Sequence, residues 1–372
     1  MNFRLDQASL AEALAELDRR CWLFDQLPID PQHADWLRKR AWIRTIHGTT
    51  RIEGNTASDV EVEALLAGEG EGELKITKKE RREIIGTRES LSLVDRLAQD
   101  GVDPDEGVIR EVHKLVLWNQ SPLLTPGAYR KGENRVEGPN GRLIFHTPPS
   151  GDVDDLMHDF GVWLRTGAEA YPAPIAAALA HLEFVAIHPF NDGNGRTARA
   201  LVRLILTRHG YALDRLVSID AQLDIDRRSY FAALRRSLGQ TYRPGYDATP
   251  FVDYMLTAIT KSADHVLARI RGLGQLMVEI RRAISDRSVP PGMIDGLAFA
   301  WINRHIRASD YMSITGRNPQ ATTRDFQAAV DTQWLVPTGE KKGRYYVLGP
   351  RLLAVPSEGE IPASSSSADS EV

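Results

Sequence analysis

Apolar residues recur at intervals of three and four through most of the chain, and this spacing places them on one face of an α-helix. Such patterns cover residues 35–50, 58–66, 78–97, 106–118, 153–164, 174–187, 197–209 and 250–280. The last stretch is long and amphipathic, so we expect it to link two domains. The sequence therefore predicts a mainly α protein.

A different pattern begins after residue 292. Three helical stretches are expected at 297–306, 309–314 and 319–332, and two short β-rich runs flank residues 339–344. This order resembles a winged helix-turn-helix. If it reads DNA, the third helix and the wing would present Thr322, Thr323, Arg324 and Gln327, and Lys341, Lys342 and Arg344. Because the region is only mildly basic, a protein-contact or homodimer surface is an open alternative.

Length and composition narrow the class of protein. A chain of 372 residues can bury a sizeable core in more than one domain, and a net charge of −4 argues against a polyanion binder as a whole. The single cysteine, Cys21, excludes an internal disulfide. The Ser- and Glu-rich residues after 356 are expected to be disordered. Without a basic-then-apolar leader or an apolar run of spanning length, we expect a cytoplasmic protein with no membrane segment.

The densest chemistry lies in one loop between two predicted helices, His188-Pro189-Phe190-Asn191-Asp192-Gly193-Asn194-Gly195-Arg196, with Arg199 shortly after it. Proline ends the first helix. The Gly-Asn-Gly turn directs successive N–H groups toward one point at the positive end of the second helix. Such a turn favours a bound phosphate.

The residue types in this loop suggest separate tasks. His188 is the only group in it that accepts a proton near neutral pH, so it suits a general base. Asp192 supplies the carboxylate oxygen that Mg²⁺ prefers. Asn194 can donate to a phosphate oxygen, and Arg196 and Arg199 share a helix face from which both reach one polyphosphate.

At this point the chain resembles the Fic family, whose signature is His-Pro-Phe-x-Asp/Glu-Gly-Asn-Gly-Arg-x-x-Arg; every specified position is present. The resemblance extends from about Arg44 to Tyr254. It implies an all-helical catalytic core that transfers AMP from Mg·ATP to a hydroxyl side chain of a protein. It also implies a role for each motif residue: His188 is the base, Asp192 holds Mg²⁺, Gly193, Asn194, Gly195 and Arg196 bind the α- and β-phosphates of ATP, and Arg199 binds the γ-phosphate.

A second motif, Thr49-Thr50-Arg51-Ile52-Glu53-Gly54-Asn55, resembles the inhibitory motif of the same family, Ser/Thr-x-x-x-Glu-Gly/Asn. By resemblance, Glu53 pairs with Arg199. A bidentate carboxylate on that guanidinium would take the place of the γ-phosphate. The alternative is that Glu53 only precedes Gly54 at the end of a helix.

A hairpin is expected between the two motifs. Asn140-Gly141 lies between short apolar segments from Val136 to Phe145, and this pattern favours a β-hairpin. The residue pattern alone favours an ordinary surface hairpin. The resemblance instead implies a flap whose open edge pairs with the target protein. Further on, Asp226 to Phe231 resembles the segment near the adenine, with Asp226 where many relatives have Asn, and Tyr230 is its candidate contact to ATP.

Two functional classes remain open. One is a protein adenylyltransferase, self-modification included, restrained by Glu53; the other is a DNA-binding regulator that only senses nucleotide. The second needs no base, so His188 favours the enzyme. A de-AMPylating enzyme is the nearest alternative, since Glu53 could activate water. The expected domains are an N-terminal helical region with the inhibitory motif (1–100), a Fic-type core with its hairpin and linker helix (101–284), a winged helix-turn-helix (285–355) and a tail (356–372).

Overall fold

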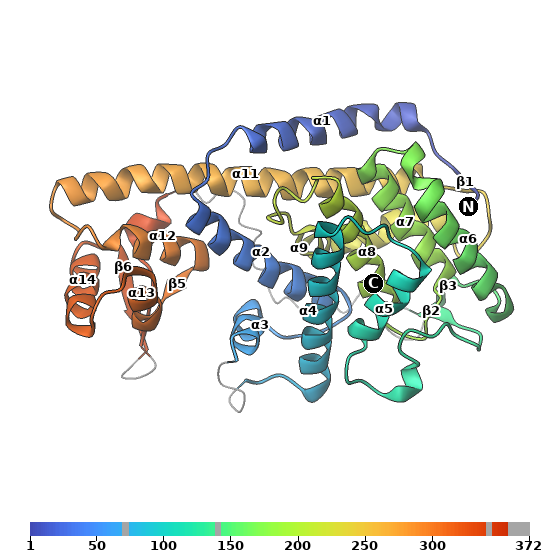
Figure 1. Ribbon diagram of the computed structural model, residues 1–372, viewed down its shortest axis with the longest axis horizontal. Helices are drawn as coiled ribbons and strands as arrows, with labels where there is room; N and C mark the ends of the chain where they lie inside the picture. The colour runs from blue at the N-terminus through green and yellow to red at the C-terminus, as the bar shows by residue number, and fades with distance from the viewer. Residues whose placement is uncertain (69–73, 138–142, 340–343, 356–372) are drawn as a thin grey trace. The chain divides into compact units, whose positions relative to one another are not determined.

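The computed structural model describes residues 1–68, 74–137, 143–339 and 344–355 (Figure 1). It confirms a mainly helical fold. The helices are α1 (Gln7–Asp25), α2 (Pro31–Ile52), α3 (Asp59–Leu66), α4 (Lys78–Gln99), α5 (Glu106–Val116), α6 (Val153–Thr166), α7 (Ala173–Ile187), α8 (Asn194–Arg208), α9 (Ile219–Ile225), α10 (Arg227–Leu238), α11 (Thr249–Ser285), α12 (Met293–Asn303), α13 (Ala308–Thr315), α14 (Pro319–Asp331) and α15 (Pro350–Leu353).

The strands are short and form three small sheets. β1 (Phe3–Arg4) pairs in parallel with β4 (Tyr246–Asp247), and β2 (Arg135–Glu137) pairs antiparallel with β3 (Leu143–His146). The third sheet is antiparallel, with order β5-β7-β6, formed by β5 (His305–Ile306), β6 (Leu335–Thr338) and β7 (Tyr345–Leu348). The predicted hairpin is therefore present, while its Asn140-Gly141 turn lies outside the described residues.

The chain divides into two compact units. The first comprises Met1–Trp22 and Trp42–Ala263, and the second comprises Leu23–Ala41 and the described residues from Asp264 on. This division differs from the expected domain ranges, because residues 42–100 cluster with the region that follows them and because the boundary inside α11 falls at Ala263. Three continuous helices, α1, α2 and α11, contribute residues to both units.

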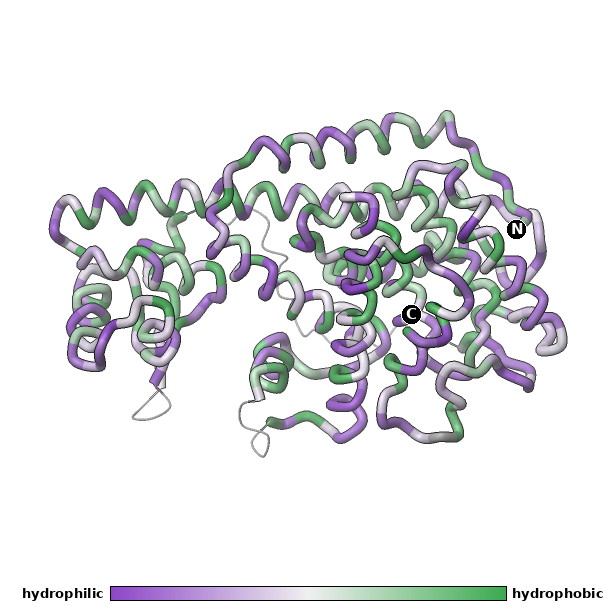
Figure 2. Tube along the Cα trace, in the orientation of Figure 1, coloured by the Kyte–Doolittle hydropathy of each residue, from purple (hydrophilic) through white to green (hydrophobic). Residues whose placement is uncertain are grey.

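Helices α7 and α8 form the centre of the first unit. α7 is apolar on all sides and almost entirely buried, as a helix enclosed by others must be. α8 packs through Leu204 into a core that also contains side chains of α2, α3, α4 and α5, among them Ile46, Val62, Ile84 and Val112. In contrast, hydrophilic and hydrophobic positions alternate along α1, where the buried residues are Leu10 and Leu17 (Figure 2). The loop between α7 and α8 is thus anchored at both ends by buried helices.

In the second unit the element order is α12, β5, α13, α14, β6 and β7. The expected helix at 297–306 was wrong at both ends. The helix begins at Met293 and stops at Asn303, because Arg304 adopts a left-handed conformation (φ 69°) and the next two residues pair with β7. Thr322, expected on the exposed face of α14, is buried with its hydroxyl donating to Asn318 O.

Some of the predicted features involve residues that the structure does not describe. Lys341, Lys342 and the tail from residue 356 lie outside the described residues. In the part of the chain that is described, no helix combines the length and the apolar character needed to cross a bilayer.

Candidate functional site

The loop between α7 and α8 creates an anion-binding turn. His188 ends α7 in the left-handed region (φ 51°), and Gly193 precedes α8 in the same region (φ 79°). The helical hydrogen bonds of α8 begin with Thr197 N donating to Gly193 O at 3.0 Å. The N–H groups of Asn194, Gly195 and Arg196 precede that ladder, so they are available at the positive end of the helix. The arrangement suits a phosphate.

The Asn194 side chain is used differently from the expectation. Its Oδ1 accepts from Phe190 N at 3.0 Å and its Nδ2 donates to Phe190 O at 2.8 Å, and the residue is buried. The side-chain amide therefore stabilises the loop by bonding to the Phe190 backbone, and it is not free to donate to a phosphate. What remains for an anion is chiefly the Asn194 backbone N–H.

His188 is set up as a neutral imidazole. Its Nδ1 lies 3.3 Å from Val185 O, and because a carbonyl only accepts, Nδ1 carries the proton and Nε2 is left as the acceptor. Burial lowers the pKa of His188 to about 4, and the positive charge of Arg130 lowers it further while Glu53 and Asp192 raise it. At neutral pH the ring can therefore accept a proton.

Asp192 supplies the carboxylate of the loop, and its side chain is accessible to solvent. Its side chain is 43% exposed, and Oδ1 accepts from Gly193 N at 2.6 Å and lies 3.7 Å from Arg196 Nη2. Among the described residues there is no cluster of three or more side chains of the types that ligate metals. A Mg²⁺ ion held by Asp192 would take its other ligands from phosphates and water, which is the usual way this cation is bound.

Arg199 is buried beneath the turn and is held by several partners. Its Nε donates to Thr49 Oγ1 at 2.7 Å, and Nη2 donates both to Thr49 O at 3.0 Å and to Glu53 Oε1 at 2.7 Å. Asp220 Oδ1 lies 3.3 Å from Nε. The expected pair of Glu53 and Arg199 is present, but it uses one carboxylate oxygen because Thr49 and Asp220 take the Nε side. The prediction of a bidentate pair between Glu53 and Arg199 was therefore wrong.

The Glu53 carboxylate also lies against the start of α8. A Cβ added to Gly195 would collide with Glu53 Oε1, so glycine is required at this position for the two to meet. Burial alone would raise the pKa of Glu53, but the positive charges of Arg199 and Arg196 outweigh it and lower the pKa below its usual value. The ionised carboxylate therefore lies where the turn and both arginines attract an anion.

Tyr230 does not face an open nucleotide site. It is 2% exposed, its hydroxyl lies 3.0 Å from His181 Nε2, and it also forms a hydrogen bond with Arg199. Burial raises the pKa of Tyr230 to about 12, so the hydroxyl stays protonated. The predicted contact to adenine is therefore wrong in this arrangement: Tyr230 supports Arg199 from behind, because the amphipathic face of α10 turns it into the core.

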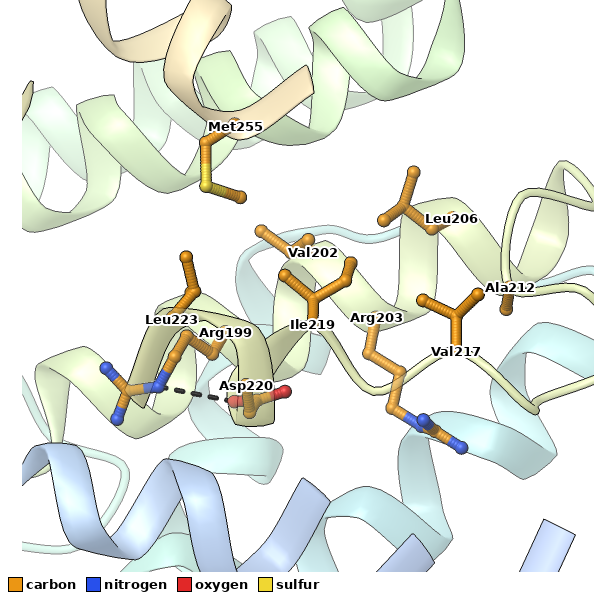
Figure 3. A pocket seen from close by; sticks show the side chains of 10 residues that line it. All are labelled: Arg199, Val202, Arg203, Leu206, Ala212, Val217, Ile219, Asp220, Leu223 and Met255. Atoms are coloured by element: carbon orange, nitrogen blue, oxygen red, sulfur yellow. Dashed lines mark ion pairs between the residues drawn. The ribbon is translucent and has the colours of Figure 1, made fainter. Parts of the chain in front are cut away.

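A small cavity lies on the same inner side of Arg199. Figure 3 shows Arg199, Asp220 and Arg203 in its lining, and the other side chains around it are apolar, among them Val202, Leu223 and Met255. Its volume of about 20 Å³ has room for roughly one water molecule and is too small for a nucleotide base. It is a packing gap behind the site.

Two residues to which the sequence assigned no role connect this loop to the segments on either side of the hairpin. His113 stacks on Phe190 with ring centroids 3.5 Å apart. Its Nδ1 accepts from Gly127 N at 2.9 Å, so Nε2 carries the proton and donates to Asp192 O at 2.9 Å. Arg130 is buried and donates from Nε to His188 O at 3.0 Å. Both side chains come from outside the motif, and no local sequence signal marks them.

Comparison with known proteins agrees with this geometry. Residues 103–206 match the model of the Fic/DOC family, so the chain carries a Fic/DOC domain. Over 237 residues it is 33% identical to the protein adenylyltransferase Fic of Nematostella vectensis, covering 62% of this chain and 50% of the relative. Over 182 residues it is 33% identical to the protein adenylyltransferase Fic of Aedes aegypti, covering 46% and 34%. The chain thus spans half or less of the length of these relatives.

Solved structures share the fold. A Fic domain-containing signaling protein from Bacteroides thetaiotaomicron superposes with a TM-score of 0.60 at 25% identity, over 70% of this chain and 97% of that one. Fic-1 (residues 134–508) from C. elegans superposes with a TM-score of 0.59 at 25% identity, over 71% and 74%. A Fic family protein from Desulfovibrio desulfuricans covers 92% of this chain at 23% identity with a TM-score of 0.57, which shows likeness of fold alone.

Proposed function

We propose that this protein transfers AMP from ATP to a hydroxyl group of a protein, and that Glu53 restrains the reaction. The observation that carries the proposal is the meeting of three features at the start of α8: an anion-binding turn, two buried arginines and a neutral imidazole. The Fic/DOC match and the names of the relatives support the same reaction class.

The phosphates of ATP would bind at the turn. The first N–H groups of α8 face them, and Arg196 adds a guanidinium that is 4% exposed. Its Nε is buried and has no hydrogen-bond partner among the described residues. A buried donor left unpaired costs free energy, so an anion that accepts from it would be stabilised. Arg199 would then bind the γ-phosphate in place of Glu53.

The chemistry needs one proton acceptor. The hydroxyl oxygen of the target attacks the α-phosphorus while His188 Nε2 takes its proton. The new P–O bond joins AMP to the target, and the bond to the bridging oxygen breaks with release of pyrophosphate. Mg²⁺, when bound at Asp192, would neutralise charge on the phosphates. The open edge of the hairpin β2–β3 would hold the target segment through backbone hydrogen bonds.

The restraint follows from competition for Arg199. Glu53 is attached to the same chain, so it is always present beside the guanidinium, and its Oε1 also approaches Gly195. A γ-phosphate must displace this carboxylate to reach Arg199, and the remaining negative charge of Glu53 would repel it. ATP could still bind, but with its α-phosphorus misplaced.

Intact mass spectrometry with Mg·ATP tests the proposal. We expect a slow or undetectable AMP adduct on the wild type and a clear adduct with Glu53→Gly, either on itself or on an added target. The matched control is the double variant Glu53→Gly with His188→Ala, which should lose the adduct while retaining bound nucleotide. An adduct in that double variant would refute the assigned base.

A second candidate activity is removal of AMP from a modified protein. The observation that favours it is the ionised Glu53 carboxylate, with a side chain 35% exposed, beside the turn that would hold the phosphate. Such a carboxylate can orient a water molecule. Incubating a modified target with each variant separates the activities, since Glu53→Gly should gain transfer and lose removal.

For the second unit we propose a winged helix, because three helices precede the antiparallel pair β6–β7. On α14, Thr323 and Arg324 are exposed, while Gln327 Nε2 donates to Asp331 at 2.7 Å. If this unit binds DNA, its affinity for DNA should fall steeply as the salt concentration rises, and the substitution Arg324→Ala should also lower it. A salt-insensitive or absent mobility shift would favour the protein-contact alternative.

A further inference from the structure

Arg130 is a buried cation whose hydrogen bonds all reach the main chain. It is 1% exposed. Nε donates to His188 O at 3.0 Å, Nη1 to Gly132 O at 3.1 Å and Nη2 to Pro148 O at 2.7 Å. Burial lowers its pKa, against the attraction of Glu133, yet a guanidinium of this kind remains charged. The charge is thus retained at the cost of desolvation, which marks a specific task for this side chain.

The three carbonyls belong to parts of the chain that must cooperate. His188 is the left-handed residue that ends α7, Gly132 precedes β2, and Pro148 follows β3. We propose that Arg130 is a positioning residue, whose planar fork joins the backbone of the base to both legs of the hairpin. The imidazole and the edge that would receive the target then keep one relative position.

Neighbouring hydrogen bonds reinforce this connection. Arg130 N donates to Pro189 O at 2.9 Å, and Asn134 Nδ2 donates to Phe190 O at 3.3 Å. Each joins the hairpin side to the motif loop. Neither bond, however, reaches His188 itself. The Arg130 side chain is the contact that controls the peptide of the base, whose left-handed conformation carries strain for a residue other than glycine.

The charge of Arg130 has a second effect on the base. The charged groups that face His188 are Glu53, Asp192 and Arg130; the two carboxylates raise its pKa, and Arg130 lowers it. Burial acts in the same direction as Arg130. Removing the positive charge should therefore raise the pKa of His188 and protonate a larger share of the ring in mildly acidic solution.

Two substitutions separate the geometric effect from the charge effect. Arg130→Lys keeps the charge, but one ammonium group cannot reproduce the fork toward three carbonyls. Arg130→Gln removes the charge as well. The matched control is Lys131→Gln, which removes an exposed cation one residue away whose ammonium pairs with Asp154 at 2.8 Å.

Kinetics of AMP transfer form the first readout, measured in a Glu53→Gly background; this part rests on the proposed function. A displacement of the base by about 1 Å can cost about 10²-fold. We expect both Arg130 variants to lower kcat by roughly tenfold to a hundredfold with KM for ATP little changed, because Arg130 is assigned no contact to ATP. Lys131→Gln should match the parent. An unchanged kcat, or a rise in KM that accounts for the whole loss, would overturn the positioning role.

The second readout does not depend on activity. We would follow the ¹⁵N shifts of the His188 ring between about pH 3 and pH 8, assigned by His188→Ala, and check the fold by circular dichroism at each pH. Arg130→Gln should protonate His188 at higher pH than the parent and Arg130→Lys should not. Identical titrations in all three proteins would refute the electrostatic half. If Glu53→Gly transfers no AMP, the proposed function fails while this titration still decides how Arg130 acts on His188. If Arg130→Gln does not fold, the kinetic result with Arg130→Lys decides the positioning role.

Discussion

Replacing Glu53 by Gly removes the carboxylate that competes for Arg199. A hydrogen bond to a charged group is worth about 1.5–3 kcal/mol. Glu53 uses a single oxygen, and its side chain is 35% exposed, so solvent screening reduces that range. About 1–2 kcal/mol remains, which corresponds to a gain of roughly 5- to 30-fold in the rate of AMP transfer. If the carboxylate were fully buried and used both oxygens, we would expect a larger gain in the rate of AMP transfer.

The assay compares initial rates of AMP incorporation at saturating Mg·ATP on the same target. Glu53→Gln is the matched control, because it keeps the size of the side chain and removes its charge; we expect a smaller gain from it. Arg199→Ala should give no gain, since it removes the γ-phosphate ligand together with its competitor. ATP binding by the wild type and Glu53→Gly should be of similar affinity.

Equal initial rates for the wild type and Glu53→Gly would refute the restraint. A gain with Arg199→Ala as large as that with Glu53→Gly would refute the competition at the guanidinium, because the γ-phosphate would then need no arginine.

The remaining predictions concern the base, the metal, pH and stability. In the Glu53→Gly background, His188→Ala should lower transfer by roughly 10²–10⁴-fold with ATP binding nearly intact by calorimetry, and retained transfer would remove His188 as the base. Asp192→Ala should lower activity and Mg²⁺ dependence together; activity equal to the parent would place the metal elsewhere. The pKa of Glu53 is lowered, so its negative charge and its pair with Arg199 are complete above the unfolded value of 4.5 and are lost only as the pH falls through the folded pKa. The rate of AMP transfer by the wild type should therefore not rise between about pH 7 and pH 5. A rise of the rate in that window would contradict the lowered pKa. Arg203→Ala leaves Asp95, whose side chain is only 13% exposed, without the partner that donates to it at 2.7 and 3.0 Å. The free energy of unfolding should therefore fall by about 3 kcal/mol in denaturant titrations, and a loss near zero would contradict the importance of this pair.

The sequence by itself determined the features that depend on neighbouring residues. The helices of the first unit follow from apolar periodicity, and the capping box from Ser58 to Glu61 starts α3 next to the predicted position. The loop from His188 to Arg196 is contiguous, so its turn, its helix start and its chemistry could all be inferred locally. The pair of Glu53 with Arg199 came from a resemblance between motifs and not from spacing.

The tertiary structure decided which side chains are free to act. Arg199 and Glu53 lie 146 residues apart, and only packing shows that Thr49 and Asp220 occupy the Nε side of the guanidinium and leave one carboxylate oxygen to pair. Burial turned Tyr230 from a proposed ligand contact into a support for Arg199. Arg130 reaches His188 O across 58 residues. These outcomes depend on burial and on the direction of donors between segments distant in the chain, and a linear pattern of residue types contains neither.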